Sequence, residues 1–248
     1  MTTTAVNPVI SDQPPLSEIQ RLAGVFVAPR KTFTDINRNA RWWAPFLLIA
    51  LFSMGFVYVV GRQVGWNTAS SNMMRMTPKQ AEKMDQMPPA QRAMVEKSFS
   101  VIAYFFSVIT LIALAVIAAI LMATFNFGAG AEIQYSRALA VVVYANLPSV
   151  IKSMIAVAVM YLPGFDASGF IMQNPAATNL GAFVDPAAHI ALYTVASSID
   201  VFALWILTLT GIGFSCISKV KQSTSIFIVF GWWAFFILVS AGWKAMFS

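Results

Sequence analysis

The chain has 248 residues, of which 58% are hydrophobic and only 10% are charged, and its formal net charge is +6. A soluble domain carries roughly 25% charged residues, so this chain cannot cover its surface with polar groups, and lipid must solvate much of it. The positive charge suits loops near anionic headgroups. No stretch has the basic stripe or aromatic platform of a nucleic-acid-binding domain, so nucleic acid is excluded as a partner.

The N-terminal region is the first polar part of the chain. Residues 1–15 are rich in Thr and Pro and are predicted to form a disordered tail. Residues 16–43 are predicted to form short interfacial helices on the cytoplasmic side, because they are too short and too polar to span a membrane. Ser17 and Gln20 have the spacing of a capping box, which predicts a helix start.

Basic and aromatic residues close this interfacial region. The basic side chains are Arg30, Lys31, Arg38 and Arg41. Trp42 and Trp43 follow directly and precede a long apolar run, which is the position of an aromatic belt at a membrane edge.

Residues 44–248 are predicted to form a membrane domain of five helical spans. The expected limits are about 44–60, 101–123, 137–161, 189–214 and 226–246. Residues 61–100 form a polar helical loop that is expected to lie against the membrane or to cover the bundle. The predicted fold is therefore all-α: a polytopic integral membrane protein with five transmembrane helices plus short interfacial helices.

The chain is organised around residues 197–221, which contain most of the fourth predicted span. Gly211 and Gly213 are expected to mark the end of its helix, and Lys219 and Lys221 to form the basic turn that follows. Cys216 lies near this turn and is interpreted as a small apolar filler, with acylation as the alternative.

Basic residues set the predicted orientation. The N-terminal segment and the turns that contain Arg137 and Lys219 share one side, whereas the loop after the third span has no Lys or Arg. The six basic residues of the loop at 61–100 argue the other way, but they are outweighed by the agreement of the other three segments. The prediction is a multi-pass protein of the cell membrane with its N-terminus cytoplasmic and its C-terminus extracytoplasmic.

Two ionisable residues lie inside predicted spans. Lys152 and Asp200 fall about 14–17 Å below the same membrane boundary, counting about 1.5 Å per residue. An isolated charge at that depth costs roughly 3 kcal/mol or more, so the two are predicted to form an ion pair. The pair can fix helix register or mark a substrate, headgroup or proton pathway; alternatively, one side chain snorkels outward. Pro148 is predicted to kink the third span nearby, either as a simple bend or as the opening of a cavity.

Signatures of catalysis are missing from the sequence. The one histidine, His189, has no thiol or paired carboxylate near it in sequence. The glycine-rich turn at Gly128 follows no strand, so it does not fit a phosphate loop. No group of residues has metal-ligand spacing. No enzymatic activity, metal or cofactor is therefore expected.

Three stretches of the chain carry a resemblance to a known family. They are GVFVAPRKTFTDINRNARWWAPFLL at 24–48, MPPAQRAMVEKSF at 87–99 and IDVFALWILTLTGIGFSCISKVKQSTS at 199–225. Together they resemble the Yip-one domain family, the Ypt/Rab-interacting membrane proteins, and in particular its prokaryotic branch. The resemblance implies five spans and a cytoplasmic N-terminus, and it offers no catalytic residues.

The same resemblance bears on partners. Eukaryotic members bind small GTPases of the Rab type and act in traffic between the endoplasmic reticulum and the Golgi. This chain has a short N-terminal region and lacks their Asp-Leu-Tyr-Gly-Pro-like motif, which argues against GTPase binding. The expected function is that of a non-enzymatic membrane scaffold or partner subunit, in contact with lipid and with other membrane proteins or copies of itself. The alternative is a small transporter, or an accessory subunit of an export system, that uses Lys152 and Asp200.

Overall fold

The computed structural model describes residues 14–76, 78–172 and 174–247, and this part of the chain is helical. Residues 1–13 of the expected disordered tail lie outside it. Five described segments are long and apolar enough to cross a membrane, which confirms the predicted all-α class with five spans. They are Trp43–Gln63, Phe106–Gly128, Tyr135–Met160, Val201–Ser218 and Gln222–Met246.

The elements follow the chain without domain insertions. The α-helices are α1 (Glu18–Val27), α2 (Pro29–Arg38), α3 (Trp43–Gln63), α4 (Trp66–Met74), α5 (Pro78–Gln86), α6 (Pro89–Tyr104), α7 (Phe106–Ala123), α8 (Tyr135–Ala145), α9 (Pro148–Met160), α10 (Ile190–Ser198), α11 (Val201–Ser218) and α12 (Gln222–Phe247). A π-helical turn, η1 (Thr124–Gly128), extends α7. Two 3-10 turns, η2 (Ala167–Gly169) and η3 (Leu180–Phe183), lie in the loop between α9 and α10.

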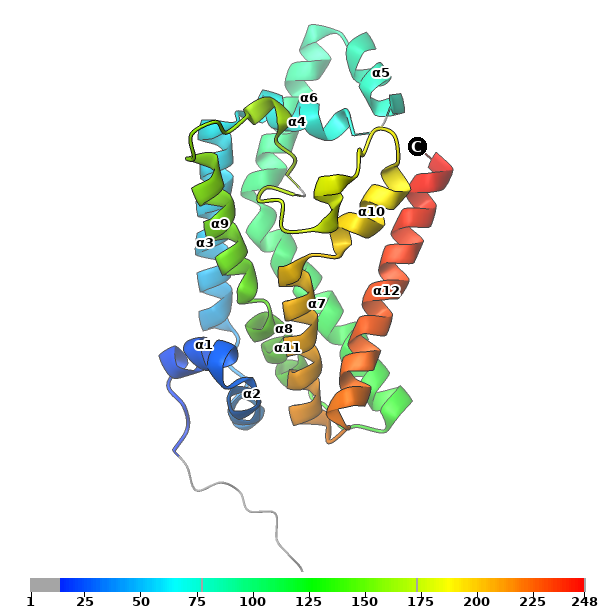
Figure 1. The fold of residues 1–248 in the computed structure, drawn as a ribbon. Helices are drawn as coiled ribbons and strands as arrows, with labels where there is room; N and C mark the ends of the chain where they lie inside the picture. The colour runs from blue at the N-terminus through cyan, green and yellow to red at the C-terminus, as the bar shows by residue number, and fades with distance from the viewer. Residues whose placement is uncertain (1–13, 77, 173, 248) are drawn as a thin grey trace, which may run out of the picture.

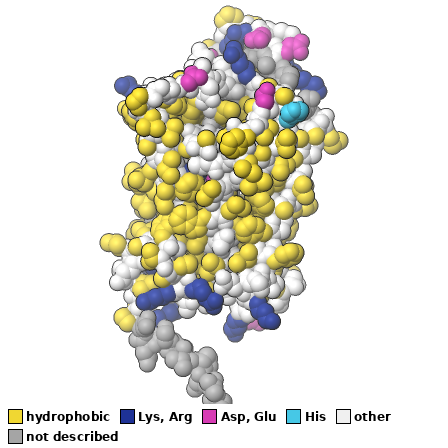
Figure 2. Space-filling model, in the orientation of Figure 1, with side chains coloured by type: hydrophobic (Ala, Val, Ile, Leu, Met, Phe, Trp, Pro, Cys, Tyr) yellow, Lys and Arg dark blue, Asp and Glu magenta, His cyan; other side chains and the backbone are white. Residues whose placement is uncertain are grey.

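The spans run up and down between two polar ends (Figure 1). The α1–α2 hairpin packs at one end, where α11 finishes and α12 begins. Helices α4 and α5 and the start of α6 form the other end, near the C-terminus. An apolar belt separates these ends in Figure 2, with Lys and Arg gathered at the hairpin end and charges of both signs at the other. The molecule therefore has the surface of a protein that crosses a bilayer.

Helix α8 is the centre of the apolar core. All eight residues from Ala138 to Ala145 are buried. Close neighbours of α8 are α7, α11, α2 and α3. The rings of Phe125 and Phe214 stack with centroids 4.8 Å apart in the same core. The α8 half of the third span is thus surrounded by protein, whereas α3, α7 and α12 leave most of their span residues unburied.

The fourth span differs from the prediction. One helix over 189–214 was expected, but the chain forms α10 and α11 with a break at Ile199 and Asp200. Asp200 has extended backbone angles, φ −114° and ψ 136°, and its carboxylate accepts from the first amides of α11. The prediction of a continuous helix is wrong because a side chain that caps a helix start competes with helix continuation at the same position.

The glycine prediction is also wrong. Gly211 and Gly213 lie inside α11, which continues to Ser218 and is capped by Lys219 in the left-handed conformation, φ 61°. Both glycines allow close packing instead. A Cβ on Gly211 would lie 2.8 Å from Ile226 Cα, at the crossing with α12. The pair therefore sets how closely α11 meets its neighbours, and it does not end the helix.

Replacing Gly213 with Ala should destabilise the bundle, because the new Cβ would clash with Val141 Cγ1 and lie 3.1 Å from Phe33 Cδ1. Overpacking costs about 1–3 kcal/mol, more than the about 0.5–1 kcal/mol that Ala gains over Gly in a helix. Gly231→Ala in α12 is the matched control, since nothing lies within 4 Å of its Cβ position. We expect a lower melting temperature in detergent for Gly213→Ala alone; equal values for the two variants would contradict this packing.

Candidate functional site

A buried polar site forms inside the helical bundle, where α11 begins. The Asp200 side chain is 3% exposed. One of its oxygens, Oδ1, accepts from the backbone N–H groups of Phe202 and Ala203 at 2.9 and 3.1 Å. The other, Oδ2, accepts from Lys152 Nζ at 3.0 Å and from the hydroxyl of Thr178. A carboxylate offers about four acceptor positions, so protein donors occupy them all.

Lys152 reaches this site from α9, and its side chain is 28% exposed. The structure therefore brings together the two ionisable residues that the sequence singled out. Pro148 lies one helical turn before Lys152, as the first residue of α9. Asn146 and Leu147 separate α8 from α9, and proline is suited to a first helical position because no hydrogen bond is required of its nitrogen there. The third span is thus interrupted at the position where a kink was predicted.

The third component of the site is a segment that sequence reasoning placed in a loop outside the membrane. Residues 178–180 fold back and pair with the broken part of the fourth span. Leu180 N–H donates to Ile199 O, and Val201 N–H donates to Thr178 O, both at 3.3 Å. No spacing rule links residue 178 to residue 200, so Thr178 was not predicted as a hydrogen-bond donor to Asp200.

Backbone geometry shows how tightly this returning segment is held. Ala177 has φ 50°, a left-handed conformation that costs a non-glycine residue about 1–2 kcal/mol. A Cβ on Gly181 would lie 2.8 Å from Asn179 Oδ1 and 3.1 Å from Ser197 Cα, so the segment touches the backbone of α10. The contacts around the segment must offset the conformational cost at Ala177.

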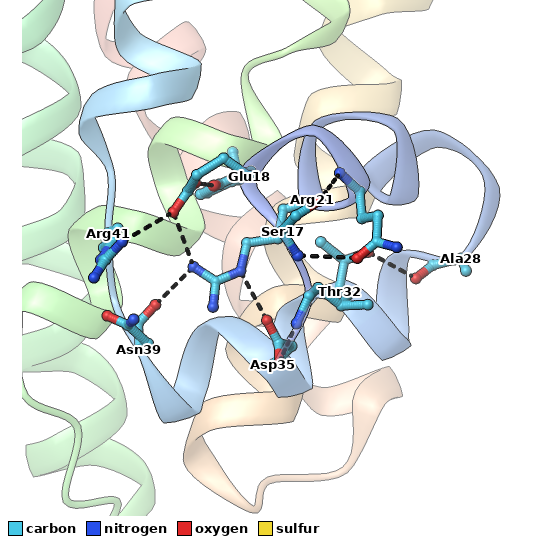
Figure 3. Close-up of polar contacts among 11 residues, drawn as sticks. Ser17, Glu18, Arg21, Ala28, Thr32, Asp35, Asn39 and Arg41 are labelled. Atoms are coloured by element: carbon cyan, nitrogen blue, oxygen red, sulfur yellow. Dashed lines mark hydrogen bonds and ion pairs between the residues drawn. The ribbon is translucent and has the colours of Figure 1, made fainter. Parts of the chain in front are cut away.

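A second polar network fixes the N-terminal hairpin, and Figure 3 shows it in close-up. Arg21 of α1 is 1% exposed. Its Nε donates to Asp35 Oδ2 of α2 at 2.7 Å, and its Nη1 donates to Asn39 O at 3.1 Å. The same Nη1 lies 3.6 Å from Glu18 Oε1. A buried guanidinium with these partners ties the two helices of the hairpin together.

The hairpin is also fixed to the membrane bundle. The hydroxyl group of Tyr144, in α8, donates a hydrogen bond to Glu18 Oε2 at 2.7 Å. Val25, Phe33 and Ile36 are fully buried in the same core as α8 and α11. The capping box of Ser17 and Gln20 that the spacing predicted is present at the start of α1. Residues 18–38 therefore pack as part of the bundle, by contacts that local sequence patterns did not reveal.

The predicted basic residues gather at the hairpin end of the molecule (Figure 2). Arg30, Lys31 and Arg38 line a groove of about 380 Å³ on α2. Arg30 Nη1 donates to Gln222 Oε1 at 2.9 Å, which links α2 to the start of α12. The turn between α11 and α12 adds Lys219 and Lys221, both exposed. This basic end, made of Arg30, Lys31, Arg38, Lys219 and Lys221, is the second candidate site.

The residues that flank the basic end are Arg41 and the two tryptophans. Arg41 Nη1 lies 4.0 Å from Glu18 Oε1. Trp42 precedes α3 and packs edge-on against Phe46, with ring centroids 6.0 Å apart. Trp43 begins α3 and is 50% exposed. In residues 14–76, 78–172 and 174–247, no cluster of three or more His, Cys, Asp or Glu could hold a metal ion.

These features define a multi-pass membrane protein with a docked polar hairpin. The family model described as the Yip1 domain matches residues 23–243, and the chain belongs to this family. The resemblance to the Yip-one domain family seen in the sequence is thereby confirmed at the level of the family. The match begins inside α1 and includes both Lys152 and Asp200. No curated protein and no solved structure matches the chain.

Substitutions at Asp200 should separate its two roles. Asp200→Asn keeps an oxygen that can accept from the amides of α11 but removes the charge opposite Lys152, whereas Asp200→Ala removes both. Breaking a buried pair costs up to about 3–5 kcal/mol, and losing a helix cap about 1 kcal/mol more. We expect the melting temperature in detergent to be highest for the wild type, lower for Asp200→Asn and lowest for Asp200→Ala.

Two further variants serve as controls for this series. The swap Lys152→Asp with Asp200→Lys should not restore stability, because a lysine cannot accept hydrogen bonds from the α11 amides. Asp185→Asn, at an exposed acid in the same loop region, should melt like the wild type. If Asp200→Asn also melts like the wild type, the ion pair does not stabilise the fold.

Arg21→Met should loosen the hairpin, because the buried Asp35 carboxylate would lose its guanidinium partner and keep the N–H of Leu16 as a donor. The native Cys216 reports this, since its Sγ lies 3.8 Å from Arg30 O of α2. We expect a membrane-permeant maleimide to label Cys216 at least about tenfold faster, which corresponds to about 1.4 kcal/mol of weakened docking. Arg62→Met, at an exposed residue of α3, is the control. Unchanged labelling in Arg21→Met would show that Arg21 does not hold the hairpin.

Proposed function

We propose that this protein is a non-enzymatic membrane scaffold or partner subunit that binds another protein at its basic end. The observation that carries the proposal is the buried contact Arg21–Asp35 together with the partly buried contact Glu18–Tyr144, which hold α1 and α2 against the bundle. A binding surface that is already ordered loses little conformational entropy on association. The hairpin is therefore suited to present a fixed surface to a partner.

The basic end is proposed to face the cytoplasm, because basic residues close to span ends favour that side. The N-terminus is then cytoplasmic and the C-terminus, at the other end of the bundle, is extracytoplasmic (Figure 1). The cell membrane is the proposed location. In this orientation the hairpin lies where cytoplasmic proteins and anionic headgroups are available.

The exposed surface of the hairpin supports this role. Ile19, Ala23 and Val27 fall on one side of α1 at intervals of four residues, and Ile19 and Val27 are 78% and 82% exposed. The basic groove on α2 belongs to the same hairpin. An apolar stripe combined with positive charge favours a partner that offers an acidic, partly apolar surface.

A second candidate, a small transporter or an accessory subunit of an export system, is motivated by the broken helices. Two interrupted spans, α8–α9 and α10–α11, meet at Lys152 and Asp200, and discontinuous helices of this kind form the binding sites of many transporters. Against this, all acceptor positions of Asp200 are filled by Lys152, Thr178 and the α11 amides. A site with its carboxylate already satisfied favours a structural role.

The test is site-specific photo-crosslinking in native membranes. A photoreactive amino acid at Lys31, on the exposed side of α2, should give one dominant adduct with a partner protein. The adduct should be lost in Arg21→Met and retained in Lys152→Met with Asp200→Leu. The matched probe position is Lys97, an exposed basic residue on α6 at the other end of the bundle, which should give no such adduct.

The results separate the two candidates. An adduct that forms equally from Lys97, or that persists in Arg21→Met, would contradict the proposed surface. The transport candidate instead requires that Lys152→Met with Asp200→Leu abolish flux into reconstituted vesicles while the protein remains folded.

A further inference from the structure

A cavity of about 470 Å³ lies in the apolar part of the bundle, and neither Lys152 nor Asp200 lines it. Five helices contribute to its wall, represented by Leu121 of α7, Val142 of α8, Thr194 of α10, Thr210 of α11 and Trp232 of α12. None of the residues that line it is charged. The cavity therefore suits an uncharged, apolar ligand.

The cavity opens sideways between α7 and α12. Helix α12 packs against α10 and α11 but makes little contact with α7. The two helices are joined near one end of the cavity, where Trp232 Nε1 donates to Thr124 Oγ1 at 3.0 Å. Ile117 and Phe236 both line the cavity and are 42% and 48% exposed. Because α7 and α12 belong to membrane spans, this opening faces hydrocarbon.

Three of the four hydroxyl groups in the wall donate within their own helices, the fourth, that of Ser240, is on an exposed residue, and the amide of Asn146 donates to Val142 O. Thr194 and Thr210 each donate to a carbonyl of their own helix, Ile190 O and Ile206 O, at 2.8 Å. Ser198 does the same with Val195 O at 2.6 Å. Because these hydroxyl groups already donate to carbonyls of their own helices, they need no hydrogen-bond acceptor on a ligand. No Lys or Arg lines the cavity, so a phosphate headgroup has no counter-charge inside it.

We infer that this cavity binds one acyl chain of a membrane phospholipid, with the headgroup left at the membrane surface. The size of the cavity excludes a partner helix. A helix about 10 Å wide fills roughly 420 Å³ per turn, and a span needs about 20 residues, or more than five turns. An extended hydrocarbon chain is thinner, is the material present at this depth, and matches the uncharged wall. The site is thus a lateral lipid-binding pocket that contacts both halves of the broken fourth span.

The test uses the full chain in vesicles of phosphatidylethanolamine and phosphatidylglycerol that contain a phospholipid with a diazirine in its acyl chain. Leu121 and Val142 are the diagnostic residues, because they line the cavity and their exposed fractions are only 3% and 1%. A chain in the cavity labels both; bulk lipid cannot reach them. Labelling confined to exposed residues such as Leu238 and Val239 would overturn the inference.

Two cavity-filling variants and a matched control sharpen the result. Ile237→Trp fills the cavity from α12 and should reduce labelling of Leu121 and Val142 about tenfold. Leu238→Trp, next to it but 67% exposed and outside the cavity wall, should leave labelling unchanged. Thr194→Phe fills the cavity from α10 and provides the same test if the α12 variant fails to fold.

A parallel experiment tests whether the bound acyl chain belongs to a phospholipid. It uses a free fatty acid that carries a diazirine in place of the phospholipid. Labelling of Leu121 and Val142 by the fatty acid alone would overturn the phospholipid assignment. Cross-links at these residues to a second copy of the chain would overturn it as well, since a protein segment would then occupy the cavity. Labelling by the phospholipid that Ile237→Trp or Thr194→Phe suppresses, and Leu238→Trp does not, supports it.

Discussion

The requirement that a buried carboxylate be fully hydrogen-bonded shapes the centre of this protein. An unsatisfied charge buried in a protein interior is too costly to persist, and Asp200 recruits four donors from three parts of the chain. Two of them are the first amides of α11, so a helix must begin at this residue. A third is Thr178, so the preceding loop must return into the bundle. The broken fourth span and its returning segment are thus consequences of one side chain.

Small residues and a buried arginine organise the opposite end. Gly213 removes the side chain that would keep Phe33 away from α11, and the fully buried Phe33 and Ile36 then hold α2 in the core. Arg21 satisfies the polar groups that this packing buries, through Asp35 and the carbonyl of Asn39. Such a network gives specificity of arrangement more than stability, because desolvation offsets much of the attraction between buried charges. The result is a basic surface in a fixed position at the membrane edge.

The break in the fourth span also bears on the apolar cavity. Because α10 ends at Ser198 and packs against α12, α10 and α11 contribute to the cavity wall as separate elements. The ion pair lies at the start of α11, the returning segment contacts both α10 and α11, and the proposed lipid pocket is lined by both helices. The ion pair is polar, whereas the pocket is mainly apolar. The proposed protein-binding end and the proposed lipid pocket then lie at different places in this protein of the Yip1 domain family. The two surfaces share no residue, although the turn with Lys219 and Lys221 joins the two helices α11 and α12 that line the cavity.

Sequence alone determined the features that depend on composition and on short-range spacing. Apolar runs long enough to span a bilayer gave the five spans, the Ser17–Gln20 spacing gave the start of α1, and the rarity of charge in spans drew attention to Lys152 and Asp200. Only the tertiary structure decided what depends on distant residues: that Thr178 meets Asp200, that Arg21 is buried against Asp35, and that Gly213 lies under Phe33 within a helix that continues beyond it. Hydropathy treats a capping aspartate and a mid-helix aspartate alike, and it treats a packing glycine and a helix-ending glycine alike. The difference lies in which groups from elsewhere in the chain come within hydrogen-bonding or van der Waals distance, and no local pattern specifies that.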